Sequence, residues 1–139
     1  MHIGIIGAGQ LGRMMALSGI PLGMRFTMYD RSRHAPGSAV APIMTGAFDD
    51  LRALARFARA VEVVTFDWEN VPVASVRAVA KIVPVWPPPR ALAIGQDRLS
   101  EKKLFQRLGI PVATYAAVDD LRGLQRAVLA LGTPGMLKT

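Results

Sequence analysis

The chain has 139 residues, 51% of them hydrophobic and 19% charged, which suits one packed domain, or one domain and the start of another, and excludes a disordered chain. It has no cysteine, which excludes disulfide bonds and thiolate metal sites and fits a cytoplasmic location, and no apolar run is long enough to cross a membrane. The net charge of +7 comes mostly from arginines spread singly, without a basic run interleaved with aromatic residues, so we expect no nucleic-acid partner.

The first predicted element is a short apolar strand, and a glycine loop follows it. The strand covers residues 2–6, and the loop reads Gly7-x-Gly9-x-x-Gly12 before a helix that continues through residues 13–18. Glycine allows a sharp backbone turn and a close approach of a ligand, and the free N–H groups of a helix start face an anion. The loop therefore predicts binding of a phosphorylated or nucleotide-like molecule at the end of the first strand.

Strands and helices then alternate along the chain. The run at residues 61–66 is nearly continuous in apolar and β-branched residues, as expected of a strand that is buried on both faces of a parallel sheet. This alternation predicts an α/β fold with an open parallel sheet. The predicted strands lie at residues 25–29, 43–45, 61–66 and 83–85, and the predicted helices at 49–61 and 72–81.

Three prolines at 87–89 form a rigid extended connector, and the pattern changes after it. We expect one domain at residues 1–95 and the start of a second at 96–139. In the second, Asp97 and the pair Asp119-Asp120 each begin a helix, the first reaching about Leu108. The remaining predicted elements there are strands at 114–118 and 136–139.

Three acidic residues follow predicted strands. Asp30 lies about 20 residues after the glycine loop, where dinucleotide-binding domains place an acid on a ribose, although the glycines could also serve only close packing. Asp67 and Glu69 follow the strand at 61–66, where alternate positions of an extended chain point to the same side. Both acids could contact a ligand beside the loop, or could cap the helix that Pro72 opens.

Two cations have open interpretations. Arg98 lies one residue into a helix and could be an ordinary surface arginine. Lys138 lies in a short apolar run, where a buried lysine would need an anion and an edge-strand lysine would not. His2 and His34 have no partners at metal-ligand spacing, so no metal site is predicted.

These residues together resemble one family, the ATP-grasp carboxyaminoimidazole ribonucleotide synthetases of bacterial purine synthesis. The resemblance runs in order along essentially the whole chain, and the ordered set is more specific than any single motif. It rests on these segments: residues 7–14, Ala35-Pro36, 65–72, Pro87-Pro88, 96–99, Glu101-Lys102, Phe105, 108–111 and 137–139.

The resemblance implies a Rossmann-like, pre-ATP-grasp domain followed by the start of an ATP-grasp domain. It implies that ATP and bicarbonate form carboxyphosphate, which carboxylates the amino group of aminoimidazole ribonucleotide. Gly9, Gln10, Leu11, Asp67 and Glu69 would then bind the ribonucleotide. Arg98 and Lys138 would contact the ATP phosphates.

The family's chains run well beyond residue 139, so we expect an N-terminal fragment that is inactive alone. The catalytic residues and the magnesium ligands would then lie beyond residue 139. A homodimer is expected for the full-length protein.

This chain has Asp67 where the family generally has Glu, and Trp68 where Phe or Ile is common, which puts the strength of the substrate contact in question. Two alternatives stay open. One is a relative of the formate-dependent glycinamide ribonucleotide transformylases, which have Glu in place of Gln10. The other is a stand-alone Rossmann-type nucleotide-binding module, in which Asp30 contacts a ribose and Arg98 and Lys138 have no role.

Overall fold

The computed structural model describes residues 1–138, which form two compact units, one of residues 1–96 and one of residues 97–138. The first unit contains the sheet and the buried core. Among the described residues, none of the helices is both long enough and apolar enough to cross a membrane.

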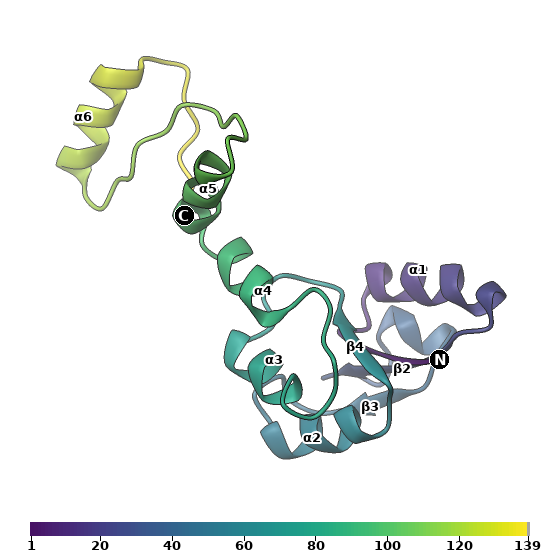
Figure 1. Ribbon diagram of the computed structural model, residues 1–139. Coiled ribbons are helices and arrows are strands. Elements are labelled where there is room, and N and C mark those ends of the chain that lie inside the picture. Colours follow the sequence, from purple (N-terminus) through teal and green to yellow (C-terminus); the bar gives the residue numbers. More distant parts are fainter. Residues whose placement is uncertain (139) are drawn as a thin grey trace. The chain divides into compact units, whose positions relative to one another are not determined.

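The first unit is built on a parallel sheet of four strands in the order β3-β2-β1-β4 (Figure 1). The strands are β1 (His2–Ile6), β2 (Arg25–Asp30), β3 (Ile43–Thr45) and β4 (Val63–Phe66). The predicted strands of residues 2–6, 25–29 and 43–45 are thus confirmed. Since all the strands are parallel, their carboxyl ends meet at one edge of the sheet, which is the usual place for a ligand.

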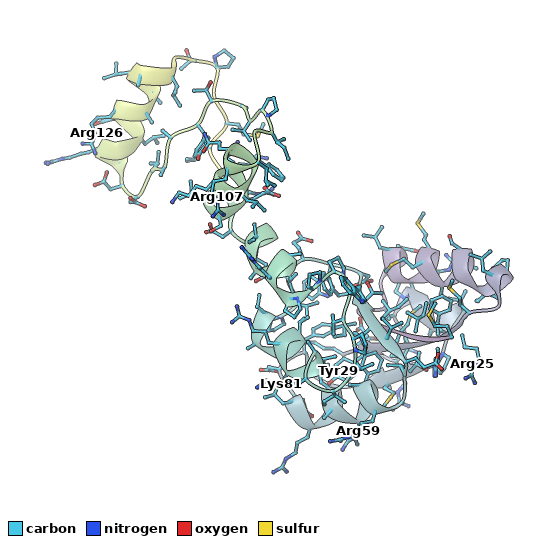
Figure 2. The ribbon with its side chains drawn as sticks, viewed as in Figure 1. Arg25, Tyr29, Arg59, Lys81, Arg107 and Arg126 are labelled. Carbon is cyan, nitrogen blue, oxygen red and sulfur yellow. The ribbon has the colours of Figure 1, made fainter. Side chains whose placement is uncertain are left out.

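Helices cover both faces of this sheet (Figure 1), so the predicted α/β class is confirmed. Neighbouring residues of a strand point to opposite faces. Ile5 and the paired Met28 pack on the side of α1 (Gln10–Gly19), whereas Ile6 and Tyr29 join the larger core beneath α2 (Leu51–Arg59). Figure 2 shows Tyr29 in this interior, while Arg25, Arg59 and Lys81 project from the outside.

Capping explains where α2 begins. The carboxylate of Asp50 accepts hydrogen bonds from the N–H groups of Arg52 and Ala53, both at 3.0 Å, which satisfies two of the donors that a helix start leaves open. Four short helices complete the first unit: η1 (Ile20–Leu22), η2 (Pro36–Ala39), α3 (Val73–Val79) and α4 (Pro89–Gly95).

Two predictions near the end of this unit were wrong. The segment at 83–85 forms only one isolated bridge, between Val64 and Val85, and not a strand. The extended proline connector ends at Pro88, because Pro89 opens α4. The fixed φ of proline suits the first position of a helix, where its missing N–H costs nothing.

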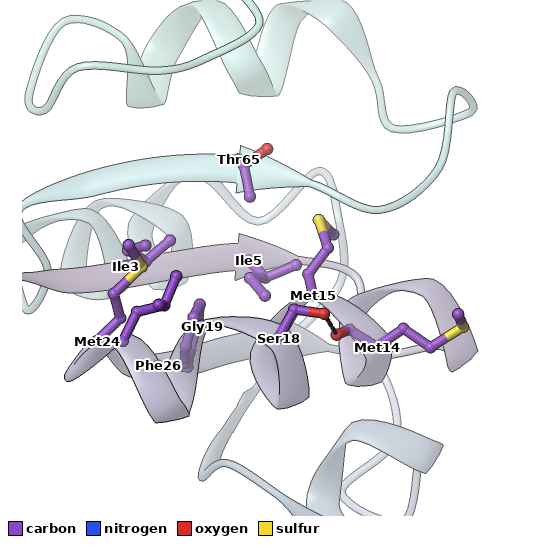
Figure 3. A pocket seen from close by; sticks show the side chains of 10 residues that line it. Ile3, Ile5, Met14, Met15, Ser18, Gly19, Met24, Phe26 and Thr65 are labelled. Carbon is purple, nitrogen blue, oxygen red and sulfur yellow. Dashed lines mark hydrogen bonds between the residues drawn. The ribbon is translucent and has the colours of Figure 1, made fainter.

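Strand β4 is not buried on both faces, contrary to the prediction. Only Val64 is buried in it, and Thr65 lines an apolar groove of about 440 Å³. Figure 3 shows Thr65 of β4 and Ile5 of β1 on one wall of this groove, with Met15 and Ser18 of α1 on the other. The strand pairs on its outer side with the single bridge at Val85, so it is an edge strand with one half-open face.

The second unit contains two helices, α5 (Arg98–Arg107) and α6 (Leu121–Leu131), each begun by a predicted cap. The carboxylate of Asp97 accepts a hydrogen bond from the N–H of Ser100, and the carboxylate of Asp120 accepts one from the N–H of Gly123. The predicted strand at 114–118 does not form, nor does one at 136–138, and Thr139 lies outside the described residues. A strand needs a neighbour to satisfy its backbone groups, and neither segment pairs with another among residues 97–138.

We predict that Gly4→Ala destabilises the first unit by about 1–3 kcal/mol, as overpacking of a tight core does. A methyl group at Gly4 would lie 2.7 Å from Cζ of Phe57 and 3.0 Å from Cγ2 of Val61. Gly95→Ala is the matched control, because its added methyl group would meet nothing within 4 Å. Urea unfolding followed by circular dichroism measures the free energy of unfolding of both variants. If Gly4→Ala is as stable as the original chain, the prediction is wrong, and β1 and α2 can move apart without cost.

Candidate functional site

The glycine loop lies at the carboxyl end of β1, between the strand and α1. The N–H of Gly7 donates to the carbonyl of Tyr29 at 2.8 Å, which carries the loop past the end of β2. Gly7 has a φ of +100°, and a Cβ there would lie 1.6 Å from Oδ1 of Asp67. Both the backbone conformation and the approach of this carboxylate therefore require glycine.

Asp67 is the residue that holds this loop. It directly follows β4, and its own N–H donates to the carbonyl of Ile6 at 3.1 Å. Its Oδ2 accepts from the N–H of Gly9 at 2.9 Å and from the N–H of Gly12 at 3.2 Å. Gly9 is the N-cap of α1 and Gly12 its third residue, so Asp67 caps a helix that is distant in sequence.

Asp30 holds the other side of the loop. Its Oδ2 accepts from the N–H of Ala8 and its Oδ1 from the N–H of Ser32, both at 2.9 Å. Together, Asp30 and Asp67 take up the N–H groups of Ala8, Gly9 and Gly12.

The predicted anion cradle is therefore largely filled by the protein's own carboxylates. Within residues 1–138, the N–H groups of Gln10 and Leu11 are the donors of the first turn that find no acceptor. A ligand at this loop would meet these two donors and two carboxylates. That arrangement suits hydroxyl or amine groups at the floor of the site better than a phosphate.

A pocket of about 310 Å³ opens over the loop. Asp30 and Asp67 contribute to its floor, and Phe48 and Trp68 contribute aromatic surface, with the ring centres 5.5 Å apart. The other residues that line it are Gly7, Gly9, Gln10 and Leu11. The structure thus gathers four of the five predicted ribonucleotide-binding residues, Gly9, Gln10, Leu11 and Asp67, around one cavity.

The electrostatics of the floor are dominated by Asp67. Burial raises the pKa of its carboxyl group, and the charge of Asp30 raises it further. The hydrogen bonds from Gly9 and Gly12 favour the ionised form and lower the pKa, but burial prevails and the pKa stays above its ordinary value of 3.8. Asp67 is therefore a desolvated acid that the loop amides only partly compensate.

Glu69 does not line this pocket. The chain bends at Asp67 and Trp68, so the alternation of an extended strand ends before Glu69, whose side chain is exposed. The alternative that these acids cap the helix after Pro72 is also wrong, because no side chain caps α3. Because the backbone bends here, Glu69 does not join Asp67 at the pocket, contrary to the expectation from strand alternation.

Gln96 has a positioning role that the sequence did not reveal. Its Nε2 donates to the carbonyl oxygens of Glu69, at 2.5 Å, and of Val71, at 2.8 Å. These bonds fix the backbone segment that follows Asp67 and Trp68. In the sequence, Gln96 belongs to the segment 96–99 that carries the family resemblance, and this segment indicates no partner for its side chain.

Arg98 and Lys138 belong to the second unit, and both are exposed. Arg98 lies at the first position of α5, and its Nη1 is 3.6 Å from Oε2 of Glu101. No group of three or more His, Cys, Asp or Glu side chains that could hold a metal ion occurs within residues 1–138.

The fold and the pocket define a Rossmann-like α/β domain whose glycine loop faces a small cavity, lined by two aspartates and two aromatic rings, at the carboxyl edge of the sheet. Residues 1–96 match the family model described as the ribonucleotide synthetase preATP-grasp domain. The chain belongs to this family, as the resemblance predicted.

Curated relatives are similar along the whole chain. N5-carboxyaminoimidazole ribonucleotide synthase of Pseudomonas aeruginosa is 41% identical over 139 residues, which is 100% of this chain and 39% of the relative. The Brucella melitensis protein of the same name is 42% identical and covers 98% of this chain, which spans 38% of its length. The chain thus corresponds to the N-terminal two-fifths of these relatives.

Solved structures agree with the fold. N5-carboxyaminoimidazole ribonucleotide synthetase from Thermus thermophilus superposes with a TM-score of 0.88 at 44% identity, over 95% of this chain and 37% of that one. The Aspergillus clavatus synthase, solved in complex with ADP and 5-aminoimidazole ribonucleotide, gives a TM-score of 0.85 at 27% identity, over 96% of this chain and 36% of that one.

We predict that the ionisation of Asp67 costs stability as pH rises. A raised pKa in the folded state means that the folded protein binds the proton more tightly than the unfolded chain. The contribution of Asp67 is therefore fully present below pH 3.8 and is lost as pH rises through the raised pKa.

Asp67→Asn, which cannot ionise, lacks this loss. The free energy of unfolding of the original chain minus that of Asp67→Asn should fall as pH rises from about 3 to about 7. Urea titrations at a series of pH values measure this difference. A difference that grows with pH would show that the loop amides outweigh the burial of the carboxylate.

Proposed function

We propose that this chain forms the ribonucleotide-binding domain and the first part of the ATP-binding domain of a carboxyaminoimidazole ribonucleotide synthetase. The reaction would use ATP and bicarbonate to carboxylate the amino group of aminoimidazole ribonucleotide in purine synthesis. Residues 1–95 would recognise the ribonucleotide, and residues 96–139 would begin the ATP-grasp domain.

The observation that carries this proposal is the similarity along the full length of the chain to proteins that bear this name. It extends past the family-matched residues 1–96 into the second unit. The pocket supports the proposal independently, because its polar floor and aromatic surface match the amine, hydroxyl groups and ring of an aminoimidazole ribonucleoside.

The proposed ribonucleotide contacts are Gly9, Gln10, Leu11, Asp67 and Glu69. Gln10 and Leu11 offer N–H groups that have no acceptor within residues 1–138, so they can bind the ligand directly. Asp67 has a second function, since Oδ2 holds the loop. Glu69 is exposed outside the pocket, and its assignment rests on the sequence resemblance alone.

The proposed ATP-phosphate contacts are Arg98 and Lys138, whose cationic groups are exposed and suited to transferring phosphoryl oxygens. Magnesium would accompany ATP, but residues 1–138 offer no cluster for it, and we derive no step through the metal. Bicarbonate as a substrate, a homodimer of the full-length protein and a cytoplasmic location are parts of the proposal that the resemblance implies.

The alternative of a stand-alone Rossmann-type module loses support from the second unit. The similarity to proteins that bear the synthase name continues past residues 1–96 through residues 97–139, which such a module would not need. The alternative of a formate-dependent transformylase loses support because the Pseudomonas and Brucella relatives carry the synthase name.

We predict that the 139-residue chain binds aminoimidazole ribonucleotide and does not bind NAD or NADP in the micromolar range. Isothermal titration calorimetry with each ligand tests this. The loop carboxylates would repel a dinucleotide pyrophosphate, whereas they can accept hydrogen bonds from an amine or hydroxyl group. Micromolar binding of NAD without binding of the ribonucleotide would replace the proposed function with the nucleotide-binding module.

A further inference from the structure

We propose that Trp68 is a specificity-determining residue of this pocket, and that its indole ring stacks on the heterocyclic ring of the bound ribonucleotide. The inference rests on the proposed function and adds the recognition of the ring to it.

Trp68 is placed for this contact by its neighbour. It follows Asp67, whose carboxylate is fixed to the amides of Gly9 and Gly12, so the pocket floor and the indole belong to one short segment. Gln96 binds the backbone after this segment through two carbonyl oxygens. The backbone at Trp68 is therefore fixed on both sides, by the hydrogen bonds of Asp67 before it and by those of Gln96 after it.

An aromatic cluster packs against the indole. The ring centre of Trp68 lies 5.5 Å from that of Phe48 at an interplanar angle of 59°. Phe48 is only 6% exposed and also packs against Tyr29, with ring centres 6.2 Å apart. The guanidinium carbon of Arg31 lies 5.4 Å from the centre of the Phe48 ring, which adds a cation–π contact.

Core packing alone does not account for Trp68. The side chain is 37% exposed and lines the cavity with Gln10 and Leu11, so part of its surface faces the space where a ligand would lie. An aromatic surface beside two carboxylates suits a planar ring that carries N–H groups at its edge. Aminoimidazole has this form, whereas a ribose phosphate has no π-face.

The chain has two tryptophans, which makes the contact measurable. Trp86 is 65% exposed and does not line this pocket, so it is the matched control. In Trp86→Phe, Trp68 is the single fluorophore, and in Trp68→Phe only Trp86 reports. Titration of both variants with aminoimidazole ribonucleotide should change the emission of the first and leave that of the second unchanged.

Affinity gives the second measurement. We expect Trp68→Leu to weaken binding of the ribonucleotide in calorimetry by about tenfold, the usual scale of one ring stacking on an aromatic side chain. Trp68→Phe keeps a π-face and should stay within about threefold of the original chain. The circular dichroism spectra and unfolding midpoints of the variants identify any loss that comes from misfolding.

Three results would overturn the inference while the proposed function stands. They are an unchanged affinity in Trp68→Leu, an unchanged emission of Trp68 at saturation, or equal losses in the Leu and Phe variants. If the original chain does not bind the ribonucleotide at all, the proposed function fails, and the stacking inference fails with it.

Discussion

The site depends on one carboxylate that joins two elements far apart in the sequence. Asp67 at the end of β4 accepts the N–H groups of Gly9 and Gly12, at the start of α1. The same carboxylate occupies the space that a side chain at Gly7 would need. The glycine pattern is therefore explained at least as much by the approach of Asp67 as by the approach of a ligand.

This interaction changes the electrostatic character of the helix start. An open N-terminus of a helix carries partial positive charge and attracts phosphate. Here the charges of Asp67 and Asp30 already offset it, and the pKa of Asp67 is raised because burial leaves the charge incompletely compensated. The loop thus presents acceptors together with the few donors left at Gln10 and Leu11, a mixed surface that favours polar neutral or amine groups.

The sequence predicted the sheet better than the site. The strands β1, β2 and β3 and the helix caps Asp97 and Asp120 follow from local patterns, and the structure has each of them. The strand-end rule indicated that the glycine loop and Asp67 belong together, because parallel strands end at one edge, and the family resemblance added Gln10 and Leu11. It could not show that Asp67 would bind the loop itself, since that depends on the bend after Phe66 and on distances between β1 and β4. The bonds of Gln96 to residues 69 and 71 are invisible in sequence for the same reason.

The contrast between the two units shows what a local pattern can determine. No residue in 97–138 is buried, yet α5 and α6 form where their caps predict, because a helix satisfies its backbone groups within itself. The apolar segments at 114–118 and 136–138 stay without strand pairing, since a strand has no such internal partner. The segment at 83–85 shows that a neighbour is necessary but not sufficient, because it lies beside the edge strand β4 and forms only one bridge with it. Local sequence therefore determined α5 and α6, whereas each strand formed only where a neighbouring strand was available to share its hydrogen bonds.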